Sequence, residues 1–231
     1  MYIIGNYKET DRMSDLICEK YQMLLVMSRF GISLGFGDKS ISEVCEDNGV
    51  DTRTFLAVVN LLVNEDKRPE VEKNHLSIEA LVQYLKNSHT YFLDFKLPSI
   101  REKLMEAIDH ENDNVALAII RYYDEYAEEV SNHMMYEEKI VFPYIQSLLD
   151  NNRKKQYNID IFIKRHDSVE FKLSELKNII IKYYPSRSSN ELNSVLFDIF
   201  SCSRDLASHN DVEDRLLVPA VKSLELKMEG K

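Results

Sequence analysis

The chain contains one short phrase twice, and its residue types are those that bind metal ions. In each copy a histidine is followed four positions later by a glutamate and ten positions later by a proline. The two copies are His133, Glu137 and Pro143, and His209, Glu213 and Pro219. Four positions in an α-helix make one turn plus about 40°, so the imidazole and the carboxylate project from the same face. Two matching copies predict half of a dinuclear metal site.

Two further histidines complete the pattern. His89 precedes His133 by 44 positions, and His166 precedes His209 by 43 positions. All four histidines fall on apolar stripes of helical period. The helices predicted to carry them span residues 78–107, 114–149 and 159–183, with a last helix beginning after Pro185. The chain is therefore predicted to repeat one helical hairpin, and its short connections favour an all-α, up-down-up-down four-helix bundle.

Buried imidazoles and carboxylates need a partner, because bare polar groups in a bundle core cost several kcal/mol. Neutral imidazole suits iron, zinc, copper and nickel, and a carboxylate can bridge two cations. We predict two iron ions, with an oxo or hydroxo bridge and room for a small ligand. The predicted terminal ligands are His89, His133, His166 and His209, and the predicted bridges are Glu137 and Glu213. Iron matches the known di-iron carboxylate bundles, although affinity alone does not exclude zinc or manganese.

The competing interpretation is that each histidine is an ordinary core residue, which is the commoner case for a lone inward-facing histidine. The metal interpretation depends on the joint arrangement, in which four histidines lie on core stripes and two have a glutamate one turn later. His75 and His110 lack this placement and are expected to be exposed. Glu138 lies off the apolar stripe and is expected to face solvent.

Residues 1–66 are predicted to form a small helical domain. Apolar spacing predicts one helix from Met13 to Arg29, ending at Gly31, and two capped helices after a glycine-rich loop. A DNA-binding helix-turn-helix is disfavoured, because the would-be recognition helix carries one basic residue among apolar ones. The charged residues 67–76 predict a linker, which leaves 77–231 for the bundle.

Composition agrees with a globular protein built of long helices, with 44% hydrophobic residues, 29% charged residues, 6 glycines and 5 prolines. The net charge of -10 disfavours a nucleic-acid partner. Three widely spaced cysteines indicate neither a disulfide framework nor a thiolate metal cage, which fits a reducing compartment. The sequence lacks a leader pattern and a membrane-length apolar run, so a cytoplasmic location without membrane contact is predicted.

On these motifs the chain resembles the hemerythrin-like superfamily and, within it, the di-iron family called repair of iron centres. The phrase from His133 to Pro143 is similar to that family's central motif. His166-Asp167 and the phrase that begins at His209 are similar to its later motifs. The resemblance implies a di-iron centre on the six residues named above. It also implies repair of iron-sulfur clusters damaged by nitric oxide or oxidants, or donation of iron, in a stress response.

The resemblance extends to the N-terminal part of the chain. The stretch from Phe30 to Ile41, followed by Cys45, is similar to the family's small N-terminal domain. Where the family carries two adjacent cysteines, this chain has Gly35 and Phe36. Functions that need that thiol pair, such as iron transfer or redox exchange through it, are therefore not implied.

Two other functions stay open at this point. One is a sensor, in which the di-iron bundle reports oxygen, nitric oxide or redox state and the apolar N-terminal helices bind a regulatory protein. The other is an enzyme that reduces nitric oxide or peroxide with electrons from a donor. Oxygen carriage is disfavoured, because oxygen carriers of the superfamily have a ligand set richer in histidine. The expected partners are thus a small diatomic molecule or peroxide, an iron-sulfur or regulatory protein, and in one version a second copy of the chain.

Overall fold

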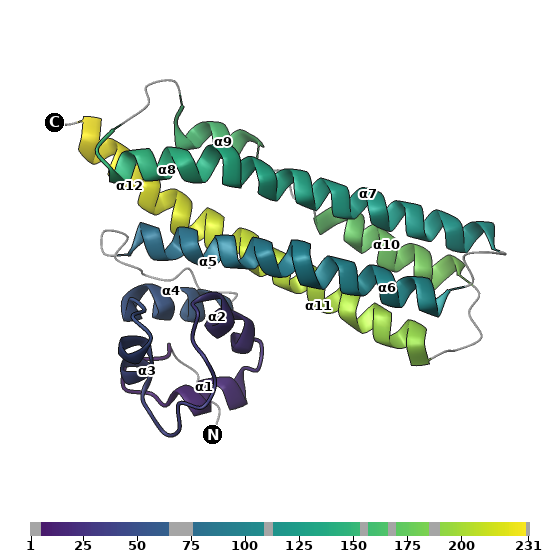
Figure 1. Ribbon diagram of the computed structural model, residues 1–231, viewed down its shortest axis with the longest axis horizontal. Coiled ribbons are helices and arrows are strands. Elements are labelled where there is room, and N and C mark those ends of the chain that lie inside the picture. Colours follow the sequence, from purple (N-terminus) through teal and green to yellow (C-terminus); the bar gives the residue numbers. More distant parts are fainter. Residues whose placement is uncertain are drawn as a thin grey trace. The chain divides into compact units, whose positions relative to one another are not determined.

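The computed structural model describes residues 6–64, 76–108, 113–152, 157–165, 170–184 and 190–229. These residues form helices and loops without a strand, and one isolated antiparallel bridge joins Arg12 to Ser40. The ribbon in Figure 1 shows the order of the helices along the chain. The all-α fold and the helical bundle predicted from the sequence are confirmed. Within the same described ranges, no helix has the length and apolar character needed to cross a lipid bilayer.

The chain divides into two compact units, which are described separately. The first unit comprises Met1–Ser88, Tyr144–Ile163 and Asn210–Lys231, and the second comprises His89–Pro143 and Lys164–His209. The predicted linker falls almost entirely outside the described residues, since 67–75 belong to the part not described. The domain boundaries given for residues 1–66, 67–76 and 77–231 therefore stay a prediction.

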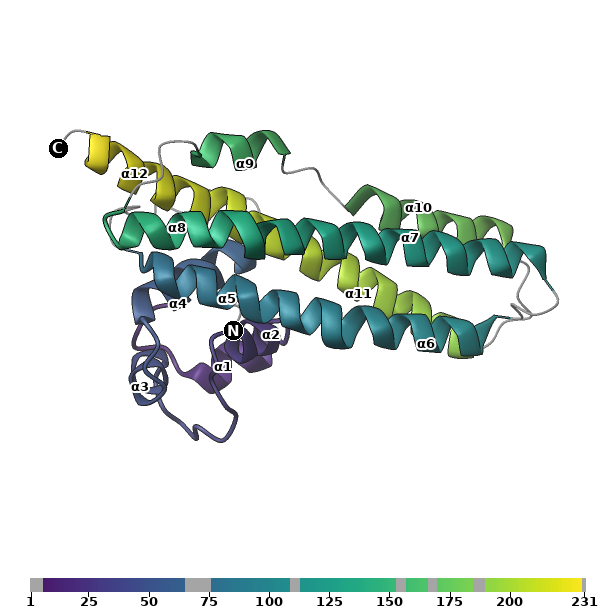
Figure 2. The ribbon, with the colours of Figure 1, turned by 45° about the horizontal axis from the view of Figure 1, so that its top comes forward.

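The second unit consists of four helical segments that lie side by side (Figure 2). Its elements, with η for a π-helix, are η2 (Tyr91–Lys96), α6 (Leu97–Ala107), α7 (Asn114–Tyr136), η3 (Glu137–Val141), α10 (Glu170–Tyr183) and α11 (Asn190–Val212) as far as His209. Buried residues from all four segments form one core cluster. On α7 the buried positions recur every three or four residues, as the helical period requires; they are Ala116, Ile119, Ile120, Tyr123, Tyr126, Val130 and Met134.

Polar contacts connect the segments of this unit. The buried Tyr123 hydroxyl donates to the Leu97 carbonyl oxygen at 2.7 Å, which joins α7 to α6. Burial strongly raises the pKa of the Tyr123 phenol, so this donor keeps its proton in ordinary buffers. Lys96 and Lys103 both donate to the Asp198 carboxylate at 2.7 Å, which joins η2 and α6 to α11. These contacts fix the relative rotation of neighbouring helices.

The first unit contains the N-terminal helices and three later parts of the chain, which are the first part of α5 (Ile78–Thr90) and the segments Tyr144–Ile163 and Asn210–Lys231. Its elements are α1 (Met13–Glu19), α2 (Met23–Arg29), α3 (Ile41–Asp47), α4 (Thr52–Val63), α5 (Ile78–Thr90) as far as Ser88, α8 (Phe142–Leu149) from Tyr144, α9 (Ile159–Arg165) as far as Ile163, η4 (Glu213–Leu217) and α12 (Val218–Glu229). The N-caps predicted for the short helices are present. Ser40 forms a capping box with Glu43, and the Asp51 carboxylate accepts from the Thr54 backbone N–H.

The helix predicted from Met13 to Arg29 is wrong in one respect, because the chain breaks it into α1 and α2. At the break, Lys20 leaves the helical conformation with φ −136° and ψ 72°. The break buries Met23 while leaving Tyr21 68% exposed, although apolar spacing places Tyr21 on the buried stripe. Which of these two side chains is buried depends on packing against neighbouring helices, and the spacing of apolar residues does not include that packing. The predicted end at Gly31 is correct, since its φ of +75° is a conformation that favours glycine.

The N-terminal helices pack on the first part of α5. Phe30 lies with its ring centroid 5.4 Å from Phe55 and 5.0 Å from Tyr84, so it joins α4 to α5. The Asn87 side-chain amide donates to the Arg29 carbonyl oxygen at 2.7 Å. The bond caps the end of α2, since the last carbonyls of a helix commonly accept hydrogen bonds from groups outside it. The small helices and α5 are thus parts of one packed unit.

Candidate metal centre

Each copy of the repeated phrase places its histidine in the last turn of an α-helix and its glutamate at the start of a π-helix. His133 lies near the end of α7 and Glu137 begins η3. His209 lies near the end of α11 and Glu213 begins η4. His89 lies in the last turn of α5. The wide π turn is therefore a shared local feature of both copies.

Glu137 lies between two histidines of the cluster. Its carboxylate is fully buried, with the Oε2 atom 3.0 Å from His89 Nε2 and the Oε1 atom 3.0 Å from His133 Nε2. Neither carboxylate oxygen meets the geometry of a hydrogen bond, despite these short distances. A buried carboxylate without well-formed hydrogen bonds is costly, and a cation is the partner that both the carboxylate and the imidazoles can share.

Four residues bring their ligand atoms within 4.8 Å of one another: His89, Glu137, His209 and Glu213. All four are buried, and His209 and Glu213 have no exposed surface. The imidazole rings of His89 and His209 lie with centroids 5.2 Å apart. Glu213 follows His209 by four residues on one unbroken helical run, which fixes its position relative to the imidazole. Nitrogen and carboxylate oxygen donors gathered this closely suit a first-row metal ion.

Apolar rings surround the imidazoles. The Phe142 ring stacks on His89 with centroids 5.5 Å apart and planes 17° apart. The Phe92 ring meets His209 edge-on at 6.0 Å. Both phenylalanines are nearly fully buried. Their rings place apolar surface beside the imidazoles, and electrostatic interactions are stronger in such an environment than in water.

The prolines of the sequence explain the π turns. In η2, η3 and η4 the backbone bonds run from Leu97 N to Phe92 O, from Phe142 N to Glu137 O and from Val218 N to Glu213 O, each spanning five residues. Each bond is followed at once by a proline, at Pro98, Pro143 or Pro219. Proline cannot donate to the carbonyl four residues earlier and its ring clashes with it, so a wider turn relieves both problems. Proline in a helix interior usually kinks or ends the helix, yet the chain stays helical through Pro98.

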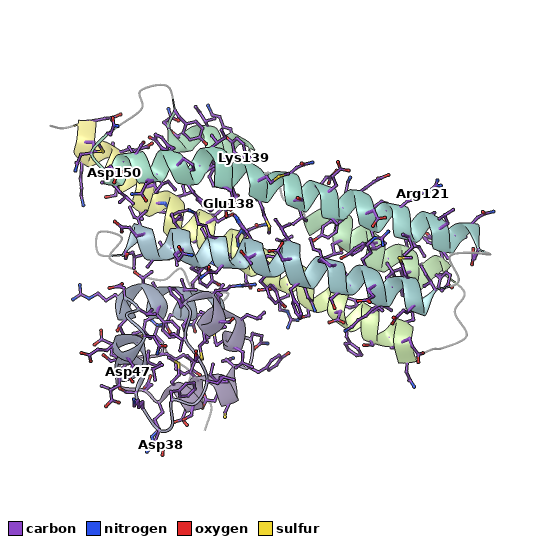
Figure 3. All side chains as sticks on the ribbon, in the orientation of Figure 1. Asp38, Asp47, Arg121, Glu138, Lys139 and Asp150 are labelled. Carbon is purple, nitrogen blue, oxygen red and sulfur yellow. The ribbon has the colours of Figure 1, made fainter. Side chains whose placement is uncertain are left out.

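Glu138 is a residue whose contact the sequence interpretation missed. Its Oε1 atom lies 3.0 Å from His89 Nδ1, while 38% of its side chain remains exposed. The expectation of a solvent-facing residue is therefore correct only in part. Figure 3 labels Glu138 and the next residue, Lys139, on opposite sides of the same helical run. The one signal for this contact in the sequence is that two glutamates, Glu137 and Glu138, stand next to each other four and five residues after His133.

The remaining predicted residues are placed as follows. His133 contacts Glu137 and keeps 11% of its side chain exposed. His166 lies outside the described residues, as do His75 and His110. The ligand set of six residues stays a prediction, of which the structure brings His89, Glu137, His209 and Glu213 together and sets His133 beside Glu137.

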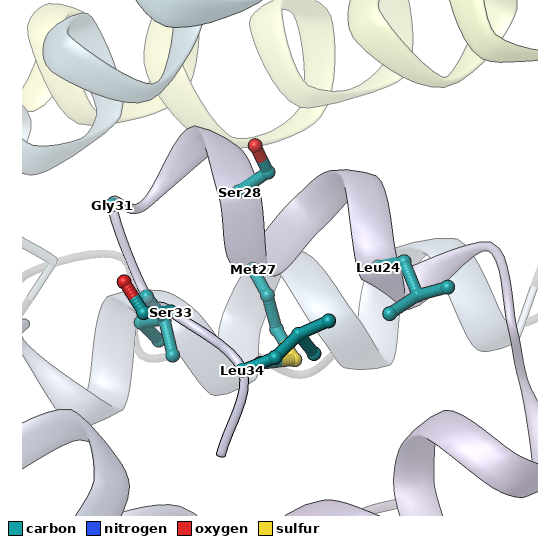
Figure 4. Close-up of a pocket in the computed structure, with 7 residues that line it drawn as sticks. Leu24, Met27, Ser28, Gly31, Ser33 and Leu34 are labelled. Atoms are coloured by element: carbon teal, nitrogen blue, oxygen red, sulfur yellow. The ribbon is translucent and has the colours of Figure 1, made fainter. Parts of the chain in front are cut away.

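A separate pocket lies in the first unit, between α2 and the loop that follows it (Figure 4). It has a volume of about 660 Å³ and is lined by Leu24, Met27, Ser28, Gly31, Ile32, Ser33 and Leu34. The lining is apolar apart from two serine hydroxyls and offers no imidazole, thiolate or carboxylate. The pocket is therefore not a metal site.

The described residues define the class of protein as a helical bundle with a buried histidine and glutamate cluster that suits a metal ion. The family model described as hemerythrin HHE cation-binding domain matches residues 80–221. Because this match spans more than half of the chain, the chain belongs to the hemerythrin family. No curated protein matches the chain closely enough to count as a relative.

Proposed function

We propose that the chain binds two iron ions at this cluster and acts in the response to nitrosative or oxidative stress. The observation that carries the proposal is the buried Glu137 carboxylate with an imidazole nitrogen 3.0 Å from each oxygen. His89, His133, His166 and His209 are the proposed terminal ligands, and Glu137 and Glu213 the proposed bridges. A bound iron pair supplies one-electron redox chemistry and binding of a small diatomic molecule or peroxide.

The protein's own residues hold the donors in place and exclude water. The i and i+4 spacing orients each histidine and glutamate before a metal ion arrives, and the stacked Phe142 ring limits rotation of His89. The two carboxylates offset the charge of bound cations in a buried site. Because imidazole and carboxylate accept iron in either common oxidation state, the donor set is compatible with redox cycling.

Repair of damaged iron-sulfur clusters, or donation of iron to them, is the proposed physiological function. Its support is the similarity of both phrases to the motifs of the repair of iron centres family. The loop around residue 35 bears on how such a protein would work. Gly35 has a φ of +97°, a conformation that a cysteine adopts only with strain, and the loop there is exposed. The loop therefore has no pair of thiols at these positions, and its backbone at residue 35 favours glycine over cysteine. The proposed function thus depends on the residues of the bundle.

The test begins with iron content and the visible spectrum of the purified protein, followed by addition to an enzyme whose iron-sulfur cluster has been nitrosylated. We expect about two iron ions per chain, from the two-metal logic of carboxylate bundles, and recovery of the enzyme's activity. His133→Ala is expected to lose both, and Glu128→Ala, an exposed position on the same helix, to lose neither. Iron binding without recovery of activity would remove the repair function, and absence of iron would remove the centre itself.

A sensor is the second candidate, favoured by one observation. Asn87, which bonds the Arg29 carbonyl oxygen at the end of α2, lies two residues before His89 on α5. A change in His89 on binding iron or its ligand therefore has a short path to the N-terminal helices. We expect amide exchange in α2 to differ between iron-loaded and metal-free protein, and Asn87→Ala to reduce the difference. Equal exchange in both forms would argue against this candidate.

The other expected partners are proposals as well. Catalytic reduction of nitric oxide or peroxide is measured in the same samples by consumption of the gas or peroxide with an added electron donor. An iron-sulfur protein is the proposed partner for repair, and a regulatory protein the proposed partner for sensing. A cytoplasmic location and a homodimer stay predictions, which fractionation and the mass in solution measure.

A further inference from the structure

We propose that Glu138 is a positioning residue of the metal centre, which holds the His89 imidazole so that its Nε2 atom is the ligand. The inference rests on the proposed metal binding and goes beyond it by assigning a residue outside the predicted ligand set. The two nitrogens of His89 have different neighbours: Nδ1 lies 3.0 Å from Glu138 Oε1, and Nε2 lies 3.0 Å from Glu137 Oε2.

The contact with Glu138 selects the tautomer of the imidazole. An ionised carboxylate only accepts hydrogen bonds, so the Nδ1 atom must carry the proton and donate it. In the neutral ring the Nε2 atom then carries the lone pair, and the Oε2 atom of the buried Glu137 carboxylate lies 3.0 Å from it. Two electron-rich atoms at 3.0 Å repel each other unless a cation lies with them. The bond to Glu138 thus prepares His89 for a metal ion, since a ligating histidine commonly donates its second nitrogen to a carboxylate.

The π turn explains how two consecutive glutamates reach the same histidine. In an α-helix, successive side chains differ in direction by about 100°. Glu137 and Glu138 are the first two residues of η3, where a wider turn reduces that angle. Glu137 is fully buried, and Glu138 reaches His89 from the solvent side with 38% of its side chain exposed. The local backbone therefore presents one carboxylate to each nitrogen of the ring.

The experiment compares the full-length chain with Glu138→Ala, Glu138→Gln and the matched control Glu128→Ala. Affinity for Zn²⁺ alone is measured by competition with a chromogenic chelator, and thermal unfolding is measured on the metal-free proteins. We expect Glu138→Ala to bind Zn²⁺ about 10–100-fold more weakly, as loss of such a partner typically does. Glu138→Gln keeps an acceptor oxygen and is expected to recover part of the affinity. Glu128→Ala is expected to bind as the unmodified chain does.

A spectroscopic measurement separates positioning from a general effect on stability. In the Zn²⁺-loaded protein, the Nδ1–H proton of His89 is expected to exchange slowly with water and to give a resolved NMR signal, which Glu138→Ala loses. Three results together would overturn the proposal in favour of a structural role. Metal-free Glu138→Ala would melt at a lower temperature, and its Zn²⁺-loaded form would keep the Nδ1–H signal of His89. Glu138→Gln would bind Zn²⁺ with the affinity of the unmodified chain. Unmodified affinity in both variants would overturn it directly. An unmodified chain that binds no metal contradicts the proposed function instead, so the two failures are distinguishable.

Discussion

At the scale of single residues, Glu137 connects the imidazoles of the candidate centre. It is fully buried, and each of its oxygens lies 3.0 Å from a histidine nitrogen. A buried carboxylate is costly without a balancing charge, and a bound cation supplies that charge in the loaded protein. The same residue should therefore affect stability and metal binding in opposite directions.

Glu137→Gln tests this opposition. The neutral amide removes a buried charge and can donate to one imidazole, so we expect the metal-free variant to be as stable as the unmodified chain or more stable. Metal content is expected to fall from about two ions per chain to about one or fewer, because the bridging charge is lost. Metal quantitation and chemical unfolding of the metal-free protein measure the two effects. A variant that binds the full amount of metal would show that Glu137 is not a ligand.

At the scale of elements, the three π turns are the distinctive local structures. Each precedes a proline, and two of them begin at a glutamate of the repeated phrase. The helix hydrogen bonds shift from a spacing of four residues to one of five, which lets the helix continue past a residue that cannot donate. In η3 this geometry also brings Glu138 to His89.

Pro143→Ala should weaken the π turn. The alanine N–H is able to donate to the carbonyl of Lys139, so the ordinary α-helical bond competes with the wider one. We expect unchanged or higher stability without metal, because proline in a helix interior is unfavourable. We expect Zn²⁺ affinity to fall by about tenfold, since Glu138 moves away from His89. Pro98→Ala serves as the comparison, because its π turn carries no carboxylate ligand, and an equal loss of affinity in both variants would contradict the explanation.

At the scale of the whole molecule, a few polar contacts join helices that are distant in sequence. Asp198 on α11 accepts hydrogen bonds from Lys96 and Lys103, which precede it by 102 and 95 residues. Burial acts to raise the pKa of Asp198, but the hydrogen bonds from Lys103 and Lys96 outweigh it and hold the pKa below its ordinary value of 3.8. A carboxyl group whose pKa is lowered by folding stabilises the folded state above its unfolded pKa, and that stability disappears as the pH falls through the folded pKa.

Asp198→Asn should therefore change the pH dependence of stability. We expect the variant to be less stable than the unmodified chain at pH 7, and the difference to shrink as the pH falls below about 4, where the carboxylate takes up its proton. Denaturant unfolding at a series of pH values measures this difference. Glu102→Gln, at an exposed position of α6, is the control. A difference that stays constant down to pH 2 would show that the charge of Asp198 is not its cause.

Metal binding should also stabilise the whole fold, because the proposed ligands come from α5, η3, α11 and η4 and gather only in the folded chain. A ligand that binds only the folded state adds about 2.7 kcal/mol when its free concentration is 100 times its dissociation constant. We expect a chelator to lower the melting temperature of the loaded protein and His209→Ala to remove that response. Identical melting with and without chelator would show that the cluster holds no metal under those conditions.

The sequence by itself determined the helical fold and placed His89, His133 and His209 on apolar faces, because the helical period is a local property that spacing reveals. It also determined the pairing of His133 with Glu137 and of His209 with Glu213, each one helical turn later. Three features depended on tertiary structure: the break between α1 and α2, the 3.0 Å approach of His89 to Glu137, and the contact of Glu138 with His89. Each depends on packing between segments far apart in the chain, or on a π turn that changes the angle between neighbouring side chains. The repeated phrase is thus visible in the sequence, whereas the residue that positions its partner histidine becomes visible only in the folded chain.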